Sequence, residues 1–125
     1  MREILFRGKN IDLEWVEGDL LQNGVDYKTA IRTNKEGLVE RVISHTVGQY
    51  TGLTDKNGKK IFEGDILVIS NQHNYPVLVK FTDFGWCCVI PNNNTYLNYR
   101  HRLENNYTKY EVIGNIHDNP ELLNL

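Results

Sequence analysis

The sequence is poor in cysteine, and its only two cysteines, Cys87 and Cys88, are adjacent in the chain. Neighbouring side chains on a β-strand point to opposite faces of the sheet, so a disulfide between these two would be strained. Apolar residues flank the pair, Trp86 on one side and Val89 on the other. We therefore predict two reduced thiols on a strand.

Long apolar runs are also missing. No window reaches the roughly eighteen apolar residues that a membrane span needs. Charged residues at Arg2, Glu3 and Arg7 interrupt the place where a signal peptide would have its apolar core. We therefore expect a cytoplasmic protein with no membrane partner.

A surplus of positive charge is absent as well. The 125 residues include 14 lysines and arginines against 16 aspartates and glutamates, which gives a formal net charge of −2. A dedicated nucleic-acid binder carries a strongly basic balance, so nonspecific coating of DNA is not expected. A chain of this length is one ordinary domain by default, and folding buries roughly two-thirds of the surface that the unfolded chain exposes.

Reactive groups do not form a recognisable catalytic or metal-binding pattern. The four histidines occur singly, with no His-x-x-x-His pair and no Cys-x-x-Cys motif to complete a zinc site. A cysteine nucleophile would need His73 or His117 as its base, but thiols in an apolar strand are more often inert core residues. We therefore predict a noncatalytic protein with no catalytic residues, no metal and no cofactor. The histidines are His45, His73, His101 and His117.

Strand and turn signals, in contrast, are abundant. Between residues 46 and 66, Asn57-Gly58 lies between two runs that contain Thr, Tyr, Val, Ile and Phe. Such a pair supplies positive φ at a two-residue turn, or closes a type I turn through a Gly bulge. The stretch predicts a hairpin that leads into the next strand.

The first 45 residues predict two antiparallel strand pairs. Turn residues at 8–12 and 33–37 suit the two connections, and Trp15 is the expected aromatic anchor of the first pair. The paired strands are residues 2–6 with 14–21, and residues 28–32 with 38–44.

The N-terminal section is too short to build an independent core. About 45 residues must bury their large apolar side chains against the rest of the chain or against another copy. We predict that this section, residues 1–45, mediates homo-oligomerisation, with edge strands paired between subunits. The side chains concerned are Leu5, Phe6, Trp15 and Ile31.

The second part of the chain, residues 46–125, is expected to form a small barrel. Three short apolar runs separated by turn-rich segments are similar to the strands of SH3-like barrels. A closing strand is expected at 111–117, and a short terminal helix with Pro120 at its first position is expected to dock its leucines on the barrel. One or two turns of helix are predicted from Thr95 to Arg102. The apolar runs are residues 65–69, 76–81 and 85–90.

The predicted fold class is therefore all-β or β-rich α+β. It consists of the N-terminal β-hairpin section, residues 1–45, packed on a small SH3-like barrel, residues 46–125. A short C-terminal helical turn completes it.

The two parts share one short internal sequence similarity: residues 16–21 (Val-Glu-Gly-Asp-Leu-Leu) resemble residues 62–67 (Phe-Glu-Gly-Asp-Ile-Leu). The structural interpretation is that both form the same bend between strand segments, with an acid that caps nearby amides. A functional alternative gathers the acids into a divalent metal site, but their spacing matches no diagnostic loop. The acids are Glu17, Asp19, Glu63 and Asp65.

Several segments carry a resemblance to a known family: the opening, residues 1–9 and 15–21, a central signature between residues 48 and 66, and the close, residues 112–123. Together they resemble the YopX-like family of bacteriophage and prophage proteins. It implies a small phage-encoded protein of unresolved function in the host bacterial cytoplasm. The signature positions, for which we expect structural roles, are Gly48, Gln49, Tyr50, Thr51, Gly52, Leu53, Asp55, Asn57, Gly58, Glu63, Gly64, Asp65, Gly114 and Asn115.

Two kinds of partner remain open. The favoured function is a protein-interaction module that binds a phage or host protein. The alternative is a nucleic-acid-binding module that uses the segment from Tyr96 to Tyr110, because aromatic residues interleaved with basic ones stack bases and contact phosphates. The candidate residues for that alternative are Tyr96, Tyr99, Arg100, Arg102, Tyr107 and Lys109.

Overall fold

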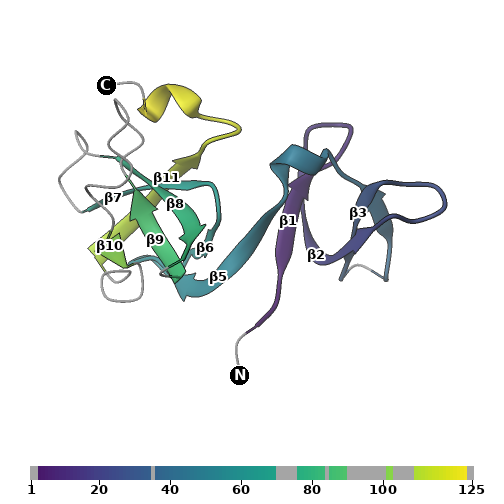
Figure 1. Ribbon diagram of the computed structural model, residues 1–125, viewed down its shortest axis with the longest axis horizontal. Coiled ribbons are helices and arrows are strands. Elements are labelled where there is room, and N and C mark those ends of the chain that lie inside the picture. The colour runs from purple at the N-terminus through teal and green to yellow at the C-terminus, as the bar shows by residue number, and fades with distance from the viewer. Residues whose placement is uncertain are drawn as a thin grey trace. The chain divides into compact units, whose positions relative to one another are not determined.

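The computed structural model describes residues 3–34, 36–69, 76–83, 85–89, 101–102 and 109–123. Within these residues the chain forms eleven strands, short 3-10 turns and no α-helix (Figure 1). The β-rich fold that the sequence predicts is therefore confirmed. The chain divides into two compact units, Met1–Tyr50 (unit 1) and Thr51–Leu125 (unit 2). The sequence predicted a boundary after residue 45.

Unit 1 is a meander of four antiparallel strands, to which the start of a fifth strand is added. The sheet order is β4-β3-β2-β1-β5. The second predicted pair is confirmed, since β3 pairs with β4, and the first is confirmed only as a pairing of two neighbouring strands, since β1 pairs with β2 but has other bounds than predicted. The strands are β1 (Phe6–Lys9), β2 (Trp15–Gln22), β3 (Thr29–Thr33), β4 (Val39–Arg41) and β5 (Gly48–Thr54).

Strand β1 begins where the sequence predicted that it would end. Residues Phe6–Lys9, and not residues 2–6, pair with β2. The prediction assigned Gly8 to a turn, but a Cβ at this glycine would lie only 3.1 Å from the Cβ of Val42. Gly8 therefore allows another segment to approach the interior of a strand, a role that the sequence does not distinguish from that of a turn glycine.

The sheet of unit 1 curls until the ends of its first and fourth strands meet. Asn10, which follows β1, forms an isolated antiparallel bridge with Val42, which follows β4. The N–H of Ile43 donates to the carbonyl oxygen of Lys9 at 2.8 Å and supports this bridge. The curl buries Val42 and the fully enclosed Ile31 close to Gly8.

Unit 2 begins with the predicted hairpin. The second half of β5 is followed by β6 (Lys60–Phe62), its neighbour in the sheet. The N–H of Gly58 donates to the carbonyl oxygen of Asp55 at 3.0 Å, and Gly58 has a φ of +83° whereas the φ of Asn57 is negative. This is the type I turn closed by a Gly bulge, one of the two alternatives that the Asn-Gly pair allowed.

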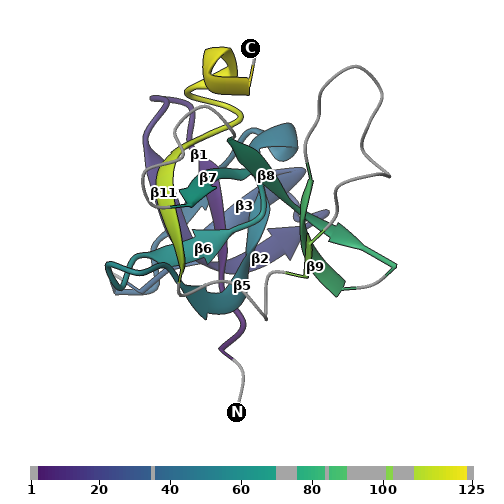
Figure 2. The ribbon, with the colours of Figure 1, turned by 90° about the vertical axis from the view of Figure 1, so that its left-hand side faces the viewer.

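The rest of unit 2 is a five-stranded antiparallel sheet in the order β10-β9-β8-β7-β11. Figure 1 labels all five strands, and Figure 2 labels β9, β8, β7 and β11 from another side. The three predicted apolar runs are confirmed as strands, as is the closing strand. Within the described residues no pairing joins β10 to β11, so the strand order is open and the SH3-like barrel stays a prediction. The strands are β7 (Asp65–Ile69), β8 (Val77–Thr82), β9 (Gly85–Val89), β10 (His101–Arg102) and β11 (Tyr110–Asn115).

The helix predicted from Thr95 to Arg102 is wrong at its end. Residues 95–100 lie outside the described residues, but His101 and Arg102 form β10 and pair with Cys88 and Cys87 of β9. The tertiary partner overrides the weak local signal for helix, as is common for short segments.

Two apolar clusters lie among the described residues of unit 2, and the terminal turn packs against one of them. Pro120–Leu123 forms the short 3-10 helix η4, whose Leu122 and Leu123 pack against the cluster of Ile66, Leu78 and Val89. The terminal helical turn and its docking are therefore confirmed. The other cluster contains Ile61, Leu67, Val77, Val79, Trp86, Cys88, Tyr110 and Val112.

Candidate interaction surface

Exposed large apolar side chains are concentrated in unit 1. Seven such side chains occur among the described residues, and six of them belong to unit 1, whereas only Phe81 belongs to unit 2. Scattered exposed apolar residues are normal on any protein. Their uneven distribution among the described residues makes unit 1 the better candidate for contacts with another protein. The six are Ile4, Ile11, Leu13, Val25, Leu38 and Val39.

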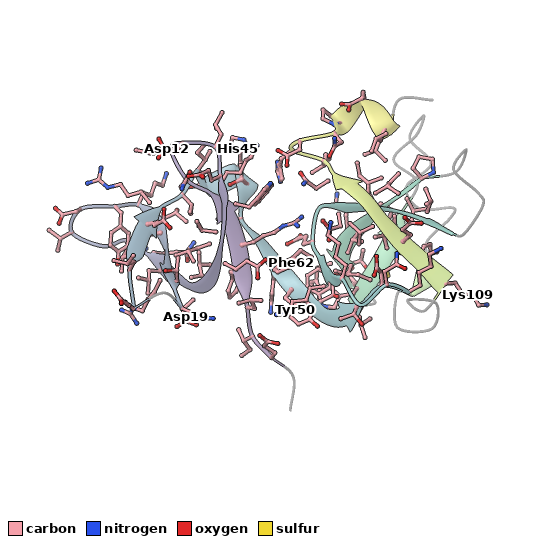
Figure 3. All side chains as sticks on the ribbon, turned by 180° about the vertical axis from the view of Figure 1, so that it is seen from behind. Asp12, Asp19, His45, Tyr50, Phe62 and Lys109 are labelled. Carbon is pink, nitrogen blue, oxygen red and sulfur yellow. The ribbon has the colours of Figure 1, made fainter. Side chains whose placement is uncertain are left out.

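The turn between β1 and β2 presents two of these side chains on a firmly held backbone. The Oδ1 atom of the buried Asn10 accepts hydrogen bonds from the N–H groups of Asp12 and Glu14, both at 3.0 Å. The N–H of Leu13 donates to the carbonyl oxygen of Asn10 at 3.0 Å. Asp12, at the outer end of this turn, is labelled in Figure 3.

Leu13 itself has a left-handed backbone conformation, with a φ of +64°. For a residue with a Cβ this costs roughly 1–2 kcal/mol, and a bulky residue there is a genuine outlier. The side chain is 63% exposed, so burial within unit 1 does not offset the strain. Such an outlier in a solvent-facing turn is a reason to look for a function of the side chain.

Trp15, the predicted anchor, is half-buried beside a cavity of about 240 Å³. The guanidinium of Arg7 lies 4.7 Å from the centroid of the Trp15 ring, and the ammonium of Lys9 lies 5.6 Å from it. These cations shield one part of the indole from water. The cavity is lined by Trp15, Val16, Glu17, Thr33, Asn34 and Glu40.

A second cavity, of about 270 Å³, lies at the base of the β1–β2 turn. Its lining combines turn residues with the end of β4, namely Asn10, Ile11, Asp12, Glu40 and Arg41. Glu40 borders both cavities, and its Oε1 atom accepts a hydrogen bond from the Nδ2 of Asn10 at 3.0 Å. The turn is thus tied to β4 by a side-chain contact as well as by the Asn10–Val42 bridge.

The similar segments 16–21 and 62–67 do not form the same bend. In unit 2, Gly64 has a φ of +92° in the turn after β6, and Asp65 Oδ2 accepts a hydrogen bond from the N–H of Phe62 at 2.7 Å. In unit 1 the matching residues lie inside β2, so the prediction of one shared bend is wrong. A Cβ at Gly18 would overlap the carbonyl oxygen of Arg32, so this glycine allows β2 and β3 to approach closely. Among the described residues, no group of three or more His, Cys, Asp or Glu side chains could hold a metal ion.

Several signature positions serve the framework of unit 2. Asp55, buried, accepts hydrogen bonds at Oδ1 from the N–H groups of Asn57 and Lys59, and at Oδ2 from that of Val112. Burial acts to raise the pKa of Asp55, but these three hydrogen bonds outweigh it and hold the pKa below its ordinary value. Asn115 accepts in the same way from the two N–H groups that follow β11, those of residues 117 and 118.

The two cysteines are free and buried. Burial raises the pKa of the Cys88 thiol to about 12, although a hydrogen bond with Tyr110 acts in the opposite direction. Cys87 Sγ lies 3.2 Å from the hydroxyl oxygen of Thr82. A nucleophilic cysteine needs a thiolate, so the environment of Cys88 is that of an inert core residue.

Most residues of the nucleic-acid alternative lie outside the described part of the chain, namely Tyr96, Tyr99, Arg100 and Tyr107. Arg102 belongs to β10, and Lys109 is exposed just before β11 (Figure 3). Tyr110, the last residue of that segment, is buried in the core of unit 2, and burial raises its pKa. It is therefore not available to stack a base.

Comparison with known proteins identifies the family. The family model described as YopX protein matches residues 5–124. The chain belongs to the YopX family. It is similar to the crystal structure of protein EF1440 from Enterococcus faecalis, with 28% identity and a TM-score of 0.62 over 98% of this chain and 99% of that one. No curated protein matches. Among the described residues, no helix is long and apolar enough to cross a membrane.

Proposed function

We propose that this member of the YopX family is a noncatalytic accessory protein of a phage or prophage, working in the bacterial cytoplasm by binding protein. Its N-terminal unit associates with itself, and its second unit, folded like an SH3-type barrel, serves as the attached scaffold. The observation that carries the proposal is that, among the residues that the structure describes, six of the seven exposed large apolar side chains belong to unit 1. Buried apolar area drives association between proteins as it drives folding.

The outer edge of β4 is the natural place for such contacts. This strand ends the sheet order, so one of its edges has no neighbouring strand among the described residues. Exposed edges template pairing with another chain, and Val39, 46% exposed, adds apolar surface there. Natural proteins place charged side chains, especially lysine, on edge strands to prevent such pairing. A lysine at position 39 therefore tests whether this edge makes the contact.

Sedimentation equilibrium at micromolar concentration tests the proposal. We expect the wild-type chain to be oligomeric, and Val39→Lys to shift it toward monomer. Phe81→Lys is the matched control, because Phe81 is an exposed apolar residue of unit 2. A wild-type chain that stays monomeric up to about 100 μM, a concentration at which even weak specific dimers form, would refute self-association.

Nucleic-acid binding remains the second candidate, because Lys109 is exposed beside the basic and aromatic segment. Fluorescence anisotropy with labelled single- and double-stranded oligonucleotides at two salt concentrations separates the two functions. A real phosphate-contacting site must weaken as salt rises. Salt-sensitive binding that Lys109→Glu abolishes would favour the nucleic-acid function over the protein one.

A further inference from the structure

We infer that the β1–β2 turn of one copy docks on the outer surface of β3 and β4 of a second copy, with Leu13 of the first contacting Val39 of the second. This inference rests on the proposed self-association and names the residues that carry it. The two surfaces are called the tip and the receiver. The tip contains Ile11, Asp12, Leu13 and Glu14, and the receiver contains Arg32, Val39 and Arg41.

The tip has the properties of a docking element. Ile11 is 77% exposed and Leu13 is 63% exposed, and Asp12 and Glu14, the chain neighbours of Leu13, are also exposed. The hydrogen bonds to Asn10 fix this backbone before any partner arrives, so little conformational entropy is lost on binding. The left-handed backbone conformation of Leu13 lowers the stability of unit 1, and the exposed side chain gains no burial within that unit that would offset this cost.

The receiver has the complementary pattern. Arg32 and Val39 are directly opposite each other across β3 and β4, so their side chains lie on the same face of the sheet. Arg41, two residues after Val39, points to that same face. All three are exposed. An apolar side chain with two arginines beside it on one face of the sheet therefore matches an apolar side chain whose two chain neighbours are acidic.

Tip and receiver are also neighbours within one copy, since Asp12 and Arg41 line the same cavity. Each copy therefore carries both halves of the match, and they approach each other at this cavity. A self-complementary surface of this kind closes through a two-fold axis, because each copy offers its tip and accepts the other's. The geometry thus fits a closed dimer better than an open filament.

Charge reversal tests the match directly. We expect the double variant Asp12→Lys/Glu14→Lys and the double variant Arg32→Glu/Arg41→Glu each to weaken the dimer by at least about tenfold, because like charges then face each other. An equimolar mixture should restore a dimer, now mixed, since the basic tip of the first variant meets the acidic receiver of the second, and the acidic tip of the second meets the basic receiver of the first. Sedimentation velocity measures all three samples, and urea unfolding shows that each variant is folded.

The backbone of Leu13 provides a second test. Asparagine tolerates the left-handed conformation, so Leu13→Asn should raise the urea midpoint while weakening the dimer by about tenfold or more. Glu36→Asn, at a φ of +57°, controls for relief of backbone strain, and Val25→Ser controls for loss of an exposed apolar side chain. Both controls should leave the dimer unchanged.

The outcomes separate this inference from the function on which it rests. A wild-type dimer that both reversals disrupt and their mixture restores supports the tip and receiver. An oligomer that neither the reversals nor Leu13→Asn weaken overturns the inference and leaves self-association standing. A monomeric wild-type chain overturns both.

Discussion

The carboxylate of Asp55 joins the β5–β6 turn to the closing strand of unit 2. Its Oδ2 atom accepts a 2.9 Å hydrogen bond from the N–H of Val112, while Oδ1 accepts two more from its own turn. The bond to Val112 spans 57 residues of sequence. A single side chain therefore fixes both the local turn and the place where a distant strand joins the fold.

Replacement of Asp55 should destabilise unit 2 out of proportion to the small chemical change. In Asp55→Asn the amide loses the charge and presents an NH₂ group to at least one backbone donor. Hydrogen bonds to charged groups contribute about 1.5–3 kcal/mol each, so we expect a loss of about 2–4 kcal/mol. Urea unfolding measures it, and Asp83→Asn, at an exposed turn position, should change stability by less than about 0.5 kcal/mol. Equal effects of the two substitutions would contradict this role.

The same group predicts the acid sensitivity of the protein. The pKa of Asp55 is lowered in the folded state, so the folded protein binds fewer protons there than the unfolded chain does. The resulting stability is complete above the unfolded pKa of about 3.9 and is lost as pH falls through the lower folded pKa. Urea midpoints between pH 6 and pH 3 should therefore fall less steeply in Asp55→Asn than in the wild type. Parallel curves would show that other carboxylates dominate.

Two glycines of unit 1 should respond differently to alanine. Gly18→Ala places a Cβ against the carbonyl oxygen of Arg32, which would separate β2 from β3, so we expect a loss of about 3 kcal/mol or more. Gly37→Ala meets no atom within 4 Å, but its φ of +70° strains an alanine by roughly 1–2 kcal/mol. Thermal or urea unfolding distinguishes the two. A Gly18 variant as stable as the Gly37 variant would mean that the strands adjust freely.

The thiols should be protected in the native protein. Because burial raises the pKa of Cys88 to about 12, almost none of this thiol is thiolate at pH 8, and the side chains of both cysteines are buried. Iodoacetamide should label them slowly in buffer and quickly in urea, which mass spectrometry resolves. Stability should also fall above about pH 9, where the thiol of Cys88 ionises in the unfolded chain but not in the folded one. Complete labelling of the folded protein within minutes would contradict the burial of this strand.

Sequence reasoning predicts that the strands of this chain exist better than it predicts where each strand begins and ends. The Asn57-Gly58 turn and the strands around it are predicted correctly because the local chemistry of a turn decides them. Strand β1 lies later in the chain than predicted. The reason is that Gly8, which the prediction assigned to a turn, lies inside the strand and contacts Val42, thirty-four positions away in the sequence. A tertiary contact of that kind leaves no local signal.

The candidate interaction surface could not be predicted from the sequence. Ile11 and Leu13 are ordinary residues in the chain, and only the φ of Leu13 and its exposure single it out. Tyr110 belongs to an aromatic and basic segment in the sequence, yet it is buried with Cys88 in the core of unit 2. The sequence gives residue types, whereas exposure depends on which face of a strand the fold turns inward.

The bridge between Asn10 and Val42 also has a consequence for synthesis. A nascent chain leaves the ribosome with β1 first, but the pairing that completes the curl needs residues more than thirty positions later. Until Val42, Ile43 and then the start of β5 emerge, the edge of β1 is open to pairing with neighbouring nascent chains on the same polysome. Slow translation of the codons for residues 34–43 should therefore lower the soluble yield, and a chaperone that shields strand edges should restore it.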